Sequence, residues 1–410
     1  MRAPLLALII LLFIPGGANA RTWHIYVDGS GDAPTIQAGI DSAAVGDSVL
    51  VFAGTYREVL TYSKDIVVTT KDGRDVTIID ASGIVATAAV LINPGTSRSC
   101  VFEGFTITGA KTALGMLDGQ PIVRDLRVSM NGGSGNTSGI VGGGTTLGPW
   151  YPIVEGCEVF NNSVSNTGPG IAFLQEMAPI IRNNICRGNL AGSGDGGGIY
   201  LVTRFSGSEI TGNIILTNTA GDHGGGIHVA NSSTPINLEI SYNLIWNNYA
   251  GGSEQTGGSG GGIWARRTNA WIHHNTIVEN TGLGVGNTYG GGIAIQQAGS
   301  PLIEQNIFAF MQAGGAIRCD GGTTPIIRNN LAWDNSGGNG VGDCPTWPAA
   351  LGNIEADPLF CDRATGDFTL GAGSPALTHP AGPLGAFPVP GCTPVLTQAT
   401  TWGKLKAAYR

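Results

Sequence analysis

A short repeated pattern constrains the fold of this chain more than any other feature. Six-residue segments that read apolar-x-x-Asn-x-apolar, or a close variant, begin at Val123 and recur at intervals of 24 to 32 residues up to Ile327. Two rows of asparagine result, the first at Asn184, Asn213, Asn243, Asn275, Asn306 and Asn330, the second at Asn131, Asn162, Asn189, Asn218, Asn248, Asn280 and Asn335. Met311 interrupts the second row. Most copies follow a Gly-rich opener that ends in an isoleucine, at Ile199, Ile227, Ile263, Ile293 and Ile317.

A repeat of this length holds several short strands rather than one long strand. Each copy contains two or three apolar stretches separated by Gly, Asn or Pro, which is typical of a coil of strands and turns. Stacked coils place equivalent residues about 4.8 Å apart, so apolar rows line one interior. Asparagine tolerates the left-handed backbone region that turns need, and stacked Asn side chains can hydrogen-bond along the stack at about 1 kcal/mol each. The repeat therefore predicts an all-β fold, a right-handed parallel β-helix. Leucine-rich repeat spacing is absent, and a propeller blade needs about 40 residues.

The first twenty residues are typical of a secretory signal. Arg2 is followed by the apolar run 5–14 and by the small residues Ala18 and Ala20, so we expect cleavage before Arg21. The apolar run is too short to cross a bilayer, and no later segment approaches the roughly 20 apolar residues of a membrane helix. We expect a secreted protein, located outside the cell, at its surface or in a periplasm.

The rest of the chain divides into four parts. Residues 21–60 are expected to form an N-terminal cap and first coil, with a short capping helix over Pro34–Ala44, Asp32 as its N-cap and Ile36, Ile40 and Ala44 on its apolar face. The parallel β-helix repeats then occupy residues 61–356. Residues 357–394 lose the Asn pattern and become Pro-rich, which indicates a closing segment over the last coil. Residues 395–410 form a tail.

The seven cysteines fit an exported protein. They are Cys100, Cys157, Cys186, Cys319, Cys344, Cys361 and Cys392. Export permits disulfides, and an odd number leaves at least one cysteine outside an intramolecular bond. Cys344, Cys361 and Cys392 crowd the C-terminal end and are the expected bridge partners, in a pairing that the sequence leaves open.

Charge and ligand spacing narrow the range of partners. The net charge of -8 is mild and the repeats hold no basic run, so nucleic acid is not expected. No Cys/His spacing is typical of zinc, and we expect no metal site. The adjacent His273 and His274 should face opposite sides of a strand and share no metal.

Candidate site residues emerge when the coils are aligned on the isoleucine of the Gly-rich opener. Alternation then places Tyr200, His228 and Trp264 in one outward row on three neighbouring coils, with Arg266 in the next row. Exposed stacked rings are a platform for sugars and an arginine suits an acidic group, although aromatic ladders also stabilise sheets. Just before these strands, Asp195 and His223 share an offset on neighbouring coils and Asp222 is adjacent to His223. They are candidates for acid–base work or for a surface hydrogen bond.

Several segments resemble known β-helix families. The segments 26–32, 35–41, 46–51 and 54–58 are similar to the N-terminal cap and first coil of the pectin lyase-like superfamily, especially of pectin methylesterases. The Asn-bearing coils resemble right-handed β-helix repeat proteins of bacteria. The segments 356–360, 367–370 and 374–376 are similar to the closing coil of secreted bacterial β-helix proteins. Together the resemblance covers nearly the whole chain after residue 20 and implies a secreted bacterial β-helix.

The catalytic signatures of these families are missing. The chain has no Gln-Asp dipeptide for the methylesterase Gln-Asp-Thr and no Arg-x-Pro-x-x-Arg of pectate lyases. It also lacks the Asp-Asp pair and the Arg-Ile-Lys of polygalacturonases and the Asp-Pro-His-Asp of mannuronan epimerases. No catalytic residue can be carried over from the resemblance.

Two functions remain open. The first is a non-catalytic secreted β-helix that is surface-associated or carbohydrate-binding and needs no cofactor. The second is a polysaccharide lyase or glycoside hydrolase acting on an acidic polysaccharide. A lyase would often use Ca²⁺, and a glycosidase needs two carboxylates roughly 5 to 10 Å apart, for which Asp195 and Asp222 are the pair near this face. The sequence does not determine the oligomeric state.

Overall fold

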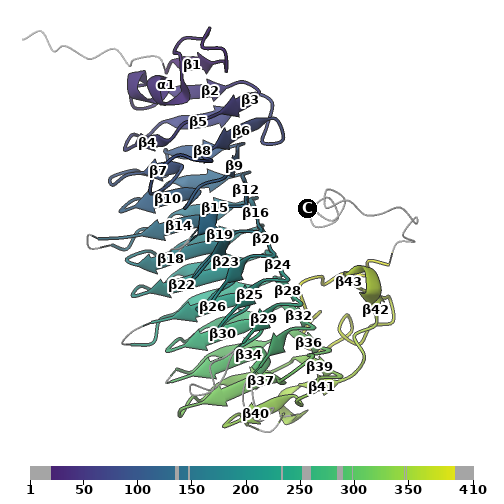
Figure 1. Ribbon diagram of the computed structural model, residues 1–410. Helices are drawn as coiled ribbons and strands as arrows, with labels where there is room; N and C mark the ends of the chain where they lie inside the picture. Colours follow the sequence, from purple (N-terminus) through teal and green to yellow (C-terminus); the bar gives the residue numbers. More distant parts are fainter. Residues whose placement is uncertain are drawn as a thin grey trace, which may run out of the picture.

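Short parallel strands wind into one elongated solenoid (Figure 1). The computed structural model describes residues 20–392 except 134–137, 146–147, 232–233, 252–259, 284–289, 298, 346 and 348. The expected signal segment, apart from Ala20, and the expected tail lie outside these residues. Each full turn adds one strand to each of three long parallel sheets, in the order A, B, C along the chain. The predicted parallel β-solenoid is confirmed.

Sheet A starts the stack and carries the first Asn row at the ends of its strands. Its strands are β1 (Thr22–Ile25), β2 (Ser48–Val51), β5 (Val67–Thr70), β8 (Val101–Glu103), β11 (Ile122–Arg124), β15 (Ile153–Glu155), β19 (Ile180–Arg182), β23 (Ser208–Thr211), β27 (Leu238–Ser241), β31 (Trp271–His273), β35 (Leu302–Glu304) and β38 (Ile326–Arg328).

Sheet B follows sheet A across the first Asn turn. Its strands are β3 (Gly54–Tyr56), β6 (Thr77–Asp80), β9 (Thr106–Thr108), β12 (Arg127–Ser129), β16 (Glu158–Phe160), β20 (Ile185–Arg187), β24 (Ile214–Leu216), β28 (Leu244–Trp246), β32 (Thr276–Val278), β36 (Ile307–Ala309), β39 (Leu331–Trp333) and β41 (Ile354–Glu355).

Sheet C closes each turn. Its strands are β4 (Leu60–Tyr62), β7 (Val90–Ile92), β10 (Leu114–Leu117), β14 (Ile140–Gly143), β18 (Ile171–Gln175), β22 (Ile199–Thr203), β26 (Ile227–Ala230), β30 (Ile263–Arg266), β34 (Gly290–Gln296), β37 (Gly315–Asp320) and β40 (Gly340–Gly342). A narrow sheet D between B and C contains β13 (Gly132–Gly133), β17 (Ser163–Val164), β21 (Leu190–Ala191), β25 (Thr219–Ala220), β29 (Tyr249–Ala250) and β33 (Thr281–Gly282).

Apolar rows fill the interior of the solenoid. In sheet A, Ile181 pairs with Ile210, and the row continues through Ile240, Ile272, Ile303 and Ile327, all buried. Burying one such side chain contributes about 1.5–3 kcal/mol relative to leaving it in water. Burial of the isoleucines also fixes the register of sheet C, because a slip of one residue would turn these side chains to the outside.

Both Asn rows form buried hydrogen-bond ladders. Asn213 illustrates the pattern, since its Oδ1 accepts from the backbone N–H and Nδ2 of Asn184 at 2.9 and 3.0 Å. The left-handed residue is the one before each ladder Asn, not the Asn itself as we expected, for example Tyr242 with φ 55 before Asn243. The sequence pattern also missed Asn353, whose Oδ1 accepts from the backbone of Asn330 and extends the first ladder by one coil. Met311 leaves its side chain out of the second ladder, but its N–H still donates to Asn335 at 3.2 Å.

The N-terminal cap is a single helix, α1 (Ile36–Ser42), shorter than expected. Its N-cap is Thr35, whose side chain accepts from Ala38 N, and not Asp32. Asp32 instead accepts from the backbone of His24 at 2.8 Å. The helix buries Ile36 and Ile40 on the first coil as expected, whereas Ala44 lies beyond its end and is exposed.

The C-terminal segment does not close the last coil as expected. The described part of it, residues 357–392, is called the C-terminal strap. It contains β42 (Phe360–Asp362), the 3₁₀ helix η2 (Arg363–Thr365) and β43 (Asp367–Leu370), which lie beside the stack (Figure 1). Phe368 packs into a buried cluster on the outer face of sheet B, with Ile185, Ile214, Leu216, Leu244 and Val278. Cys344 and Trp347, near the 3₁₀ helix η1 (Ala349–Leu351), pack against the interior core in its place.

Two disulfides join residues near the C-terminal end. Cys361 bonds to Cys392 within the strap, and Cys344 bonds to Cys319 in β37. The three expected cysteines are therefore all bridged, but Cys319 was missed because it lies within the repeats. Cys100, Cys157 and Cys186 are buried and lie outside these two disulfides.

Among the described residues, no helix is long and apolar enough to span a membrane.

Candidate functional site

The outer face of sheet C holds the predicted rows. Strand pairing places Tyr200 beside His228 and His228 beside Trp264. The next row places Ala230 beside Arg266. The predicted interior residues of these strands, among them Ile199, Ile227 and Ile263, are fully buried. The alignment on the Gly-rich opener is therefore confirmed in register and in side-chain direction.

The Gly-rich openers are explained by the close approach of neighbouring coils. A Cβ atom on Gly226 would lie 2.6 Å from the carbonyl oxygen of Gly262, and one on Gly198 would lie 2.6 Å from that of Gly226. Only glycine fits such a contact without displacement of the backbone. The openers therefore fix how tightly the coils stack just before β22, β26 and β30, and the turns before β22 and β26 carry Asp195, Asp222 and His223.

The aromatic row is not the exposed platform that we expected. Trp264 is 4% exposed and His228 is buried, while only Tyr200 is partly exposed. The rings lie against one another, with centroids 4.8 Å apart for Tyr200 and His228 and 4.4 Å apart for His228 and Trp264. His223 adds a fourth ring, 4.7 Å from Trp264. The faces of these rings are thus largely used within the protein, and the row supports the site rather than offering a flat surface.

Asp195, Asp222 and His223 meet at the turns before β22 and β26. His223 Nδ1 lies 3.2 Å from Asp195 Oδ1 and 3.1 Å from Asp222 Oδ1. The backbone N–H of His223 also donates to Asp195 Oδ1 at 2.9 Å. On the other side of Asp195, His228 Nδ1 lies 3.8 Å from Oδ2. The predicted Asp–His proximity is confirmed, and one imidazole bridges two carboxylates.

The pKa values of His223 and His228 are shifted in opposite directions. Burial opposes a charged ring at His223, but the hydrogen bonds and negative charges of Asp195 and Asp222 outweigh it and raise the pKa of His223 to about 9. Burial lowers the pKa of His228 to about 4, although Asp195 opposes this. Burial also raises the pKa of Tyr200 to about 12. Near neutral pH the site therefore holds a cationic His223 between its carboxylates and a neutral His228.

All seven residues proposed from the sequence line one pocket of about 460 Å³. The described residues that line it are Asp195, Tyr200, Val202, Asp222, His223, His228, Ala230, Asn231, Trp264, Arg266, Gln296 and Gln297. Arg266 Nε donates to Gln297 Oε1 at 2.8 Å, which holds the guanidinium at the pocket. Gln296 pairs with Arg266 on the next coil and was not selected from the sequence. Gln297 lies at the left-handed turn after the strand and was not anticipated.

Two buried polar atoms in this pocket lack a hydrogen-bond partner in the protein. Trp264 Nε1 and His228 Nδ1 have no hydrogen-bond partner among the described residues. Buried polar groups are usually paired, and leaving one unpaired costs about 1–3 kcal/mol. The pocket therefore has hydrogen-bonding capacity that the fold itself does not use.

The donor atoms of the charged cluster do not suit calcium. Asp195, Asp222 and His223 offer three possible metal-ligand atoms within 4.8 Å of one another. Ca²⁺ is bound by six to eight oxygen atoms, whereas here an imidazole nitrogen occupies the space between two carboxylates and bonds to both.

The second histidine pair differs from its prediction. His273 ends β31, but His274 has φ 51 and leaves the strand direction. The two rings therefore approach, with their Nδ1 atoms 2.8 Å apart, instead of facing opposite sides. His273 Nε2 also lies 3.1 Å from Glu239 Oε1. The two histidines and Glu239 thus form a hydrogen-bonded group on sheet A.

Comparison with known proteins agrees with the architecture. Residues 66–261 match the family described as the right-handed β-helix region. The solved structure of pectate lyase Pel9A superposes with a TM-score of 0.54 at 16% identity, over 90% of this chain and 96% of the other. The protein has the right-handed parallel β-helix fold.

Other comparisons add little to this assignment. The complex of XylC with xylose aligns with this β-helix at a TM-score of 0.47 and 10% identity, over 83% of this chain and 87% of the other. No curated protein matches the chain. At such low identities the similarity concerns the fold, so the function of this β-helix has to be argued from its own site.

Proposed function

We propose that this β-helix is a secreted, non-catalytic protein that binds a polysaccharide in the sheet C pocket. The observation that carries the proposal is the pocket itself, in which side chains from neighbouring coils gather aromatic, cationic and amide groups. Pockets with apolar walls and a few convergent polar groups are the usual ligand sites of proteins. The unpaired Trp264 Nε1 supports the proposal, because a ligand oxygen in the pocket could accept its hydrogen bond.

An acidic polysaccharide is the ligand class that suits Arg266 best. One guanidinium nitrogen bonds to Gln297, and the remaining donors of the planar group can pair with a sugar carboxylate. Gln296 and Tyr200 line the same pocket and can bond to sugar hydroxyls. Asp195 and Asp222 do not present two free negative charges to such a ligand, because both are paired with the cationic His223.

The protonation of the cluster favours binding over catalysis. A general base works best with a pKa near the working pH and with an unoccupied lone pair. His223 has a pKa of about 9 and holds its proton between two carboxylates. His228 has a pKa of about 4 and is buried, so it is a weak base near neutral pH.

A polysaccharide-cleaving enzyme is the second candidate. It is favoured by the short separation of Asp195 and Asp222, whose carboxylates and His223 Nδ1 lie within 4.8 Å of one another. Retaining glycosidases hold their two carboxyl groups about 5 Å apart. In that case the same pocket would be an active site, and one carboxylate would have to lose its pairing with His223 during the reaction.

A polysaccharide panel on the purified protein tests both candidates. Binding and product release are scored together for acidic and neutral polysaccharides. We expect binding of an acidic polymer without release of reducing or unsaturated ends. Release of products that is abolished in Asp195→Asn and Asp222→Asn would instead establish the enzyme, and the end group would separate hydrolase from lyase. Binding of no polysaccharide at all would contradict both candidates.

A further inference from the structure

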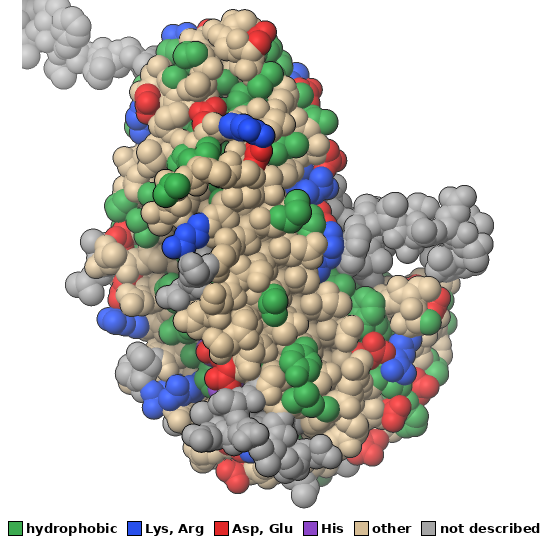
Figure 2. Space-filling view, viewed as in Figure 1, with side chains coloured by type: hydrophobic (Ala, Val, Ile, Leu, Met, Phe, Trp, Pro, Cys, Tyr) green, Lys and Arg blue, Asp and Glu red, His purple; other side chains and the backbone are tan. Residues whose placement is uncertain are grey.

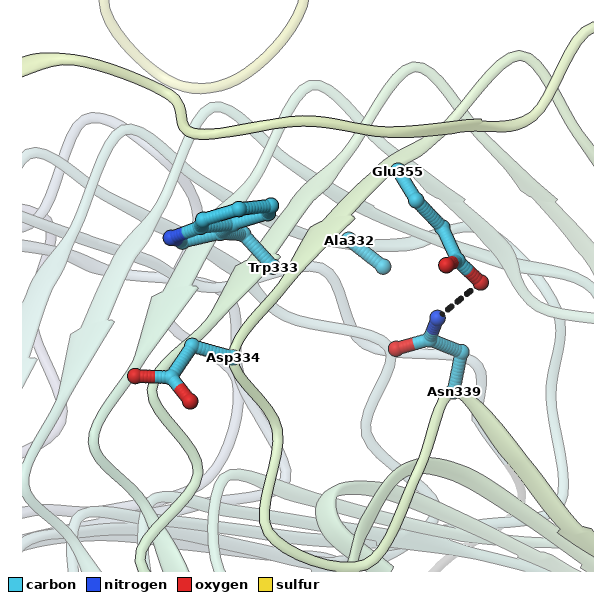
Figure 3. Close-up of a pocket in the computed structure, with 5 residues that line it drawn as sticks. All are labelled: Ala332, Trp333, Asp334, Asn339 and Glu355. Carbon is cyan, nitrogen blue, oxygen red and sulfur yellow. Dashed lines mark hydrogen bonds between the residues drawn. The ribbon is translucent and has the colours of Figure 1, made fainter.

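A second pocket, also of about 460 Å³, lies where sheet B ends. It is lined by Ala332 and Trp333 of β39, Asp334 of the turn after it, Asn339, and Glu355 of β41. Figure 3 shows Trp333 and Asp334 on one side of the opening and Glu355 and Asn339 on the other. None of these residues belongs to the sheet C pocket.

Trp333 is open to a ligand in a way that Trp264 is not. It is 38% exposed, against 4% for Trp264. Trp333 pairs with Ala309 in the outward row of sheet B, part of which the strap covers. The strap buries Leu331 and Ala309, but it leaves the indole of Trp333 partly uncovered. An exposed indole beside polar side chains is the type of surface on which the apolar face of a sugar ring stacks.

The polar groups around Trp333 accept hydrogen bonds and carry negative charge. Glu355 Oε1 accepts from Asn339 Nδ2 at 2.6 Å, which leaves its second oxygen available (Figure 3). The left-handed backbone of Asp334, with φ 48, places its carboxylate at the rim, where no described residue hydrogen-bonds to it or pairs with it. Among the described residues that line this pocket, none carries a positive charge.

We propose that this pocket binds one sugar ring without a negative charge, stacked on Trp333 and held through hydroxyl or ammonium donors by Asp334 and Glu355. Carboxylates are acceptor-only groups when ionised, so hydroxyl and ammonium donors match them. A uronic acid or a sulfated sugar would place a like charge next to two carboxylates and is disfavoured. The ligand preference is therefore opposite to that of the sheet C pocket, where Arg266 favours an acidic sugar.

The test is calorimetric titration of the whole protein with three oligosaccharides of equal length: neutral, amino-bearing and uronate. We expect the neutral or the amino-bearing ligand to bind the wild type. In Trp333→Ala the affinity should fall at least about tenfold, which corresponds to a binding free energy weaker by about 1.4 kcal/mol or more. Trp271→Ala is the matched control, since Trp271 is 43% exposed and lies on sheet A. Asp334→Asn should weaken the amino-bearing ligand more than the neutral one, because it removes charge and keeps shape.

The outcomes separate this site from the sheet C pocket. Uronate binding that is lost in Arg266→Gln but kept in Trp333→Ala reports on the sheet C pocket alone. The proposal is overturned if neither non-anionic ligand binds the wild type, or if Trp333→Ala binds it as tightly as Trp271→Ala does. Binding of a lysine oligomer without binding of either sugar would also overturn it. Thermal unfolding of each variant checks that the fold is retained.

Discussion

Two neighbouring residues share the work of each Asn turn. One adopts the left-handed backbone, and the other, the ladder Asn, makes the hydrogen bonds between coils. The residue before each ladder Asn has a left-handed backbone and can be of several types, such as Tyr242 or Gln305. The Asn itself is buried and hydrogen-bonds to its neighbours in the adjacent coils. Only a short side chain with a donor and an acceptor can make both bonds, which explains why the sequence holds Asn at the second position and varies the first.

Asn243→Ala tests the ladder. The change removes the hydrogen bonds from Asn243 Nδ2 to Ile210 O and Asn275 Oδ1, and those that Oδ1 accepts from Asn213. We expect a loss of about 2–4 kcal/mol in the free energy of unfolding, since each bond contributes about 1 kcal/mol and the groups left behind are buried. Urea unfolding measures it. The control Asn183→Gly, at an exposed turn position with φ 55, should change stability by less than about 1 kcal/mol. Equal losses in the two variants would refute a special role for the ladder.

The raised pKa of His223 predicts a pH dependence of stability. Because its pKa in the folded protein is about 9 and its ordinary value is 6.5, its ion pairs with Asp195 and Asp222 stabilise the fold fully below about pH 6.5. That contribution is lost as the pH rises through about 9. The melting temperature of the wild type should therefore exceed that of His223→Gln most at pH 6, and the gap should shrink by pH 9.5. A constant gap across this range would show that His223 does not titrate as argued.

At the scale of elements, the strap explains why part of the outer face of sheet B is apolar. Leu216, Leu244 and Val278 would be exposed on a bare solenoid, but they pack with Phe368 and Phe360 of the strap. Arg363 also pairs with Glu279 on the stack. The sequence could not predict this placement, because the segment after residue 357 has no repeat to set its register. Its apolar residues indicate burial, but they do not indicate which surface they cover.

Phe368→Ala tests the docking of the strap. Phe368 is fully buried and its ring meets Trp246 at 5.1 Å and Phe360 at 5.2 Å between centroids. We expect the substitution to destabilise the packing of Phe368 by about 3–5 kcal/mol. This loss should weaken the docking of the strap more than the stability of the coils. Limited proteolysis should then cut first within the strap, while the circular dichroism of the β-helix stays unchanged. If proteolysis instead cuts the coils as early as the strap, the two parts do not unfold separately.

At the scale of the whole molecule, periodicity decided what the sequence could predict. The repeat fixed the fold, the inward rows and the register that brings Tyr200, His228 and Trp264 together, because equivalent residues of a solenoid must stack. The repeat could not predict that Trp264 is buried. Alternation along the strand shows that the side chain points outward, but it does not show which residues cover the indole. The Trp333 pocket was missed for a related reason, because it depends on Glu355, which follows the last recognised six-residue copy of the repeat, the one that begins at Ile327.

The distribution of charge on the surface favours binding of a ligand in individual pockets over binding to an extended charged face. On the face shown in Figure 2, charged side chains are scattered among uncharged polar groups and backbone, without a broad patch of one sign. The predicted absence of nucleic acid stays a prediction, and so does secretion. Specific binding then has to come from pockets in which a few side chains converge, and the sheet C pocket combines a cation with aromatic side chains.

The most direct measurement of the central claim is the affinity for an acidic polysaccharide of two neighbouring charge variants. Arg266 lines the sheet C pocket, whereas Arg267 follows it in the chain but is not part of the lining. Arg266→Gln and Arg267→Gln change the net charge equally. We predict that affinity falls at least about tenfold in Arg266→Gln and less than about twofold in Arg267→Gln. Equal losses in both variants, or none in Arg266→Gln, would contradict binding in this pocket.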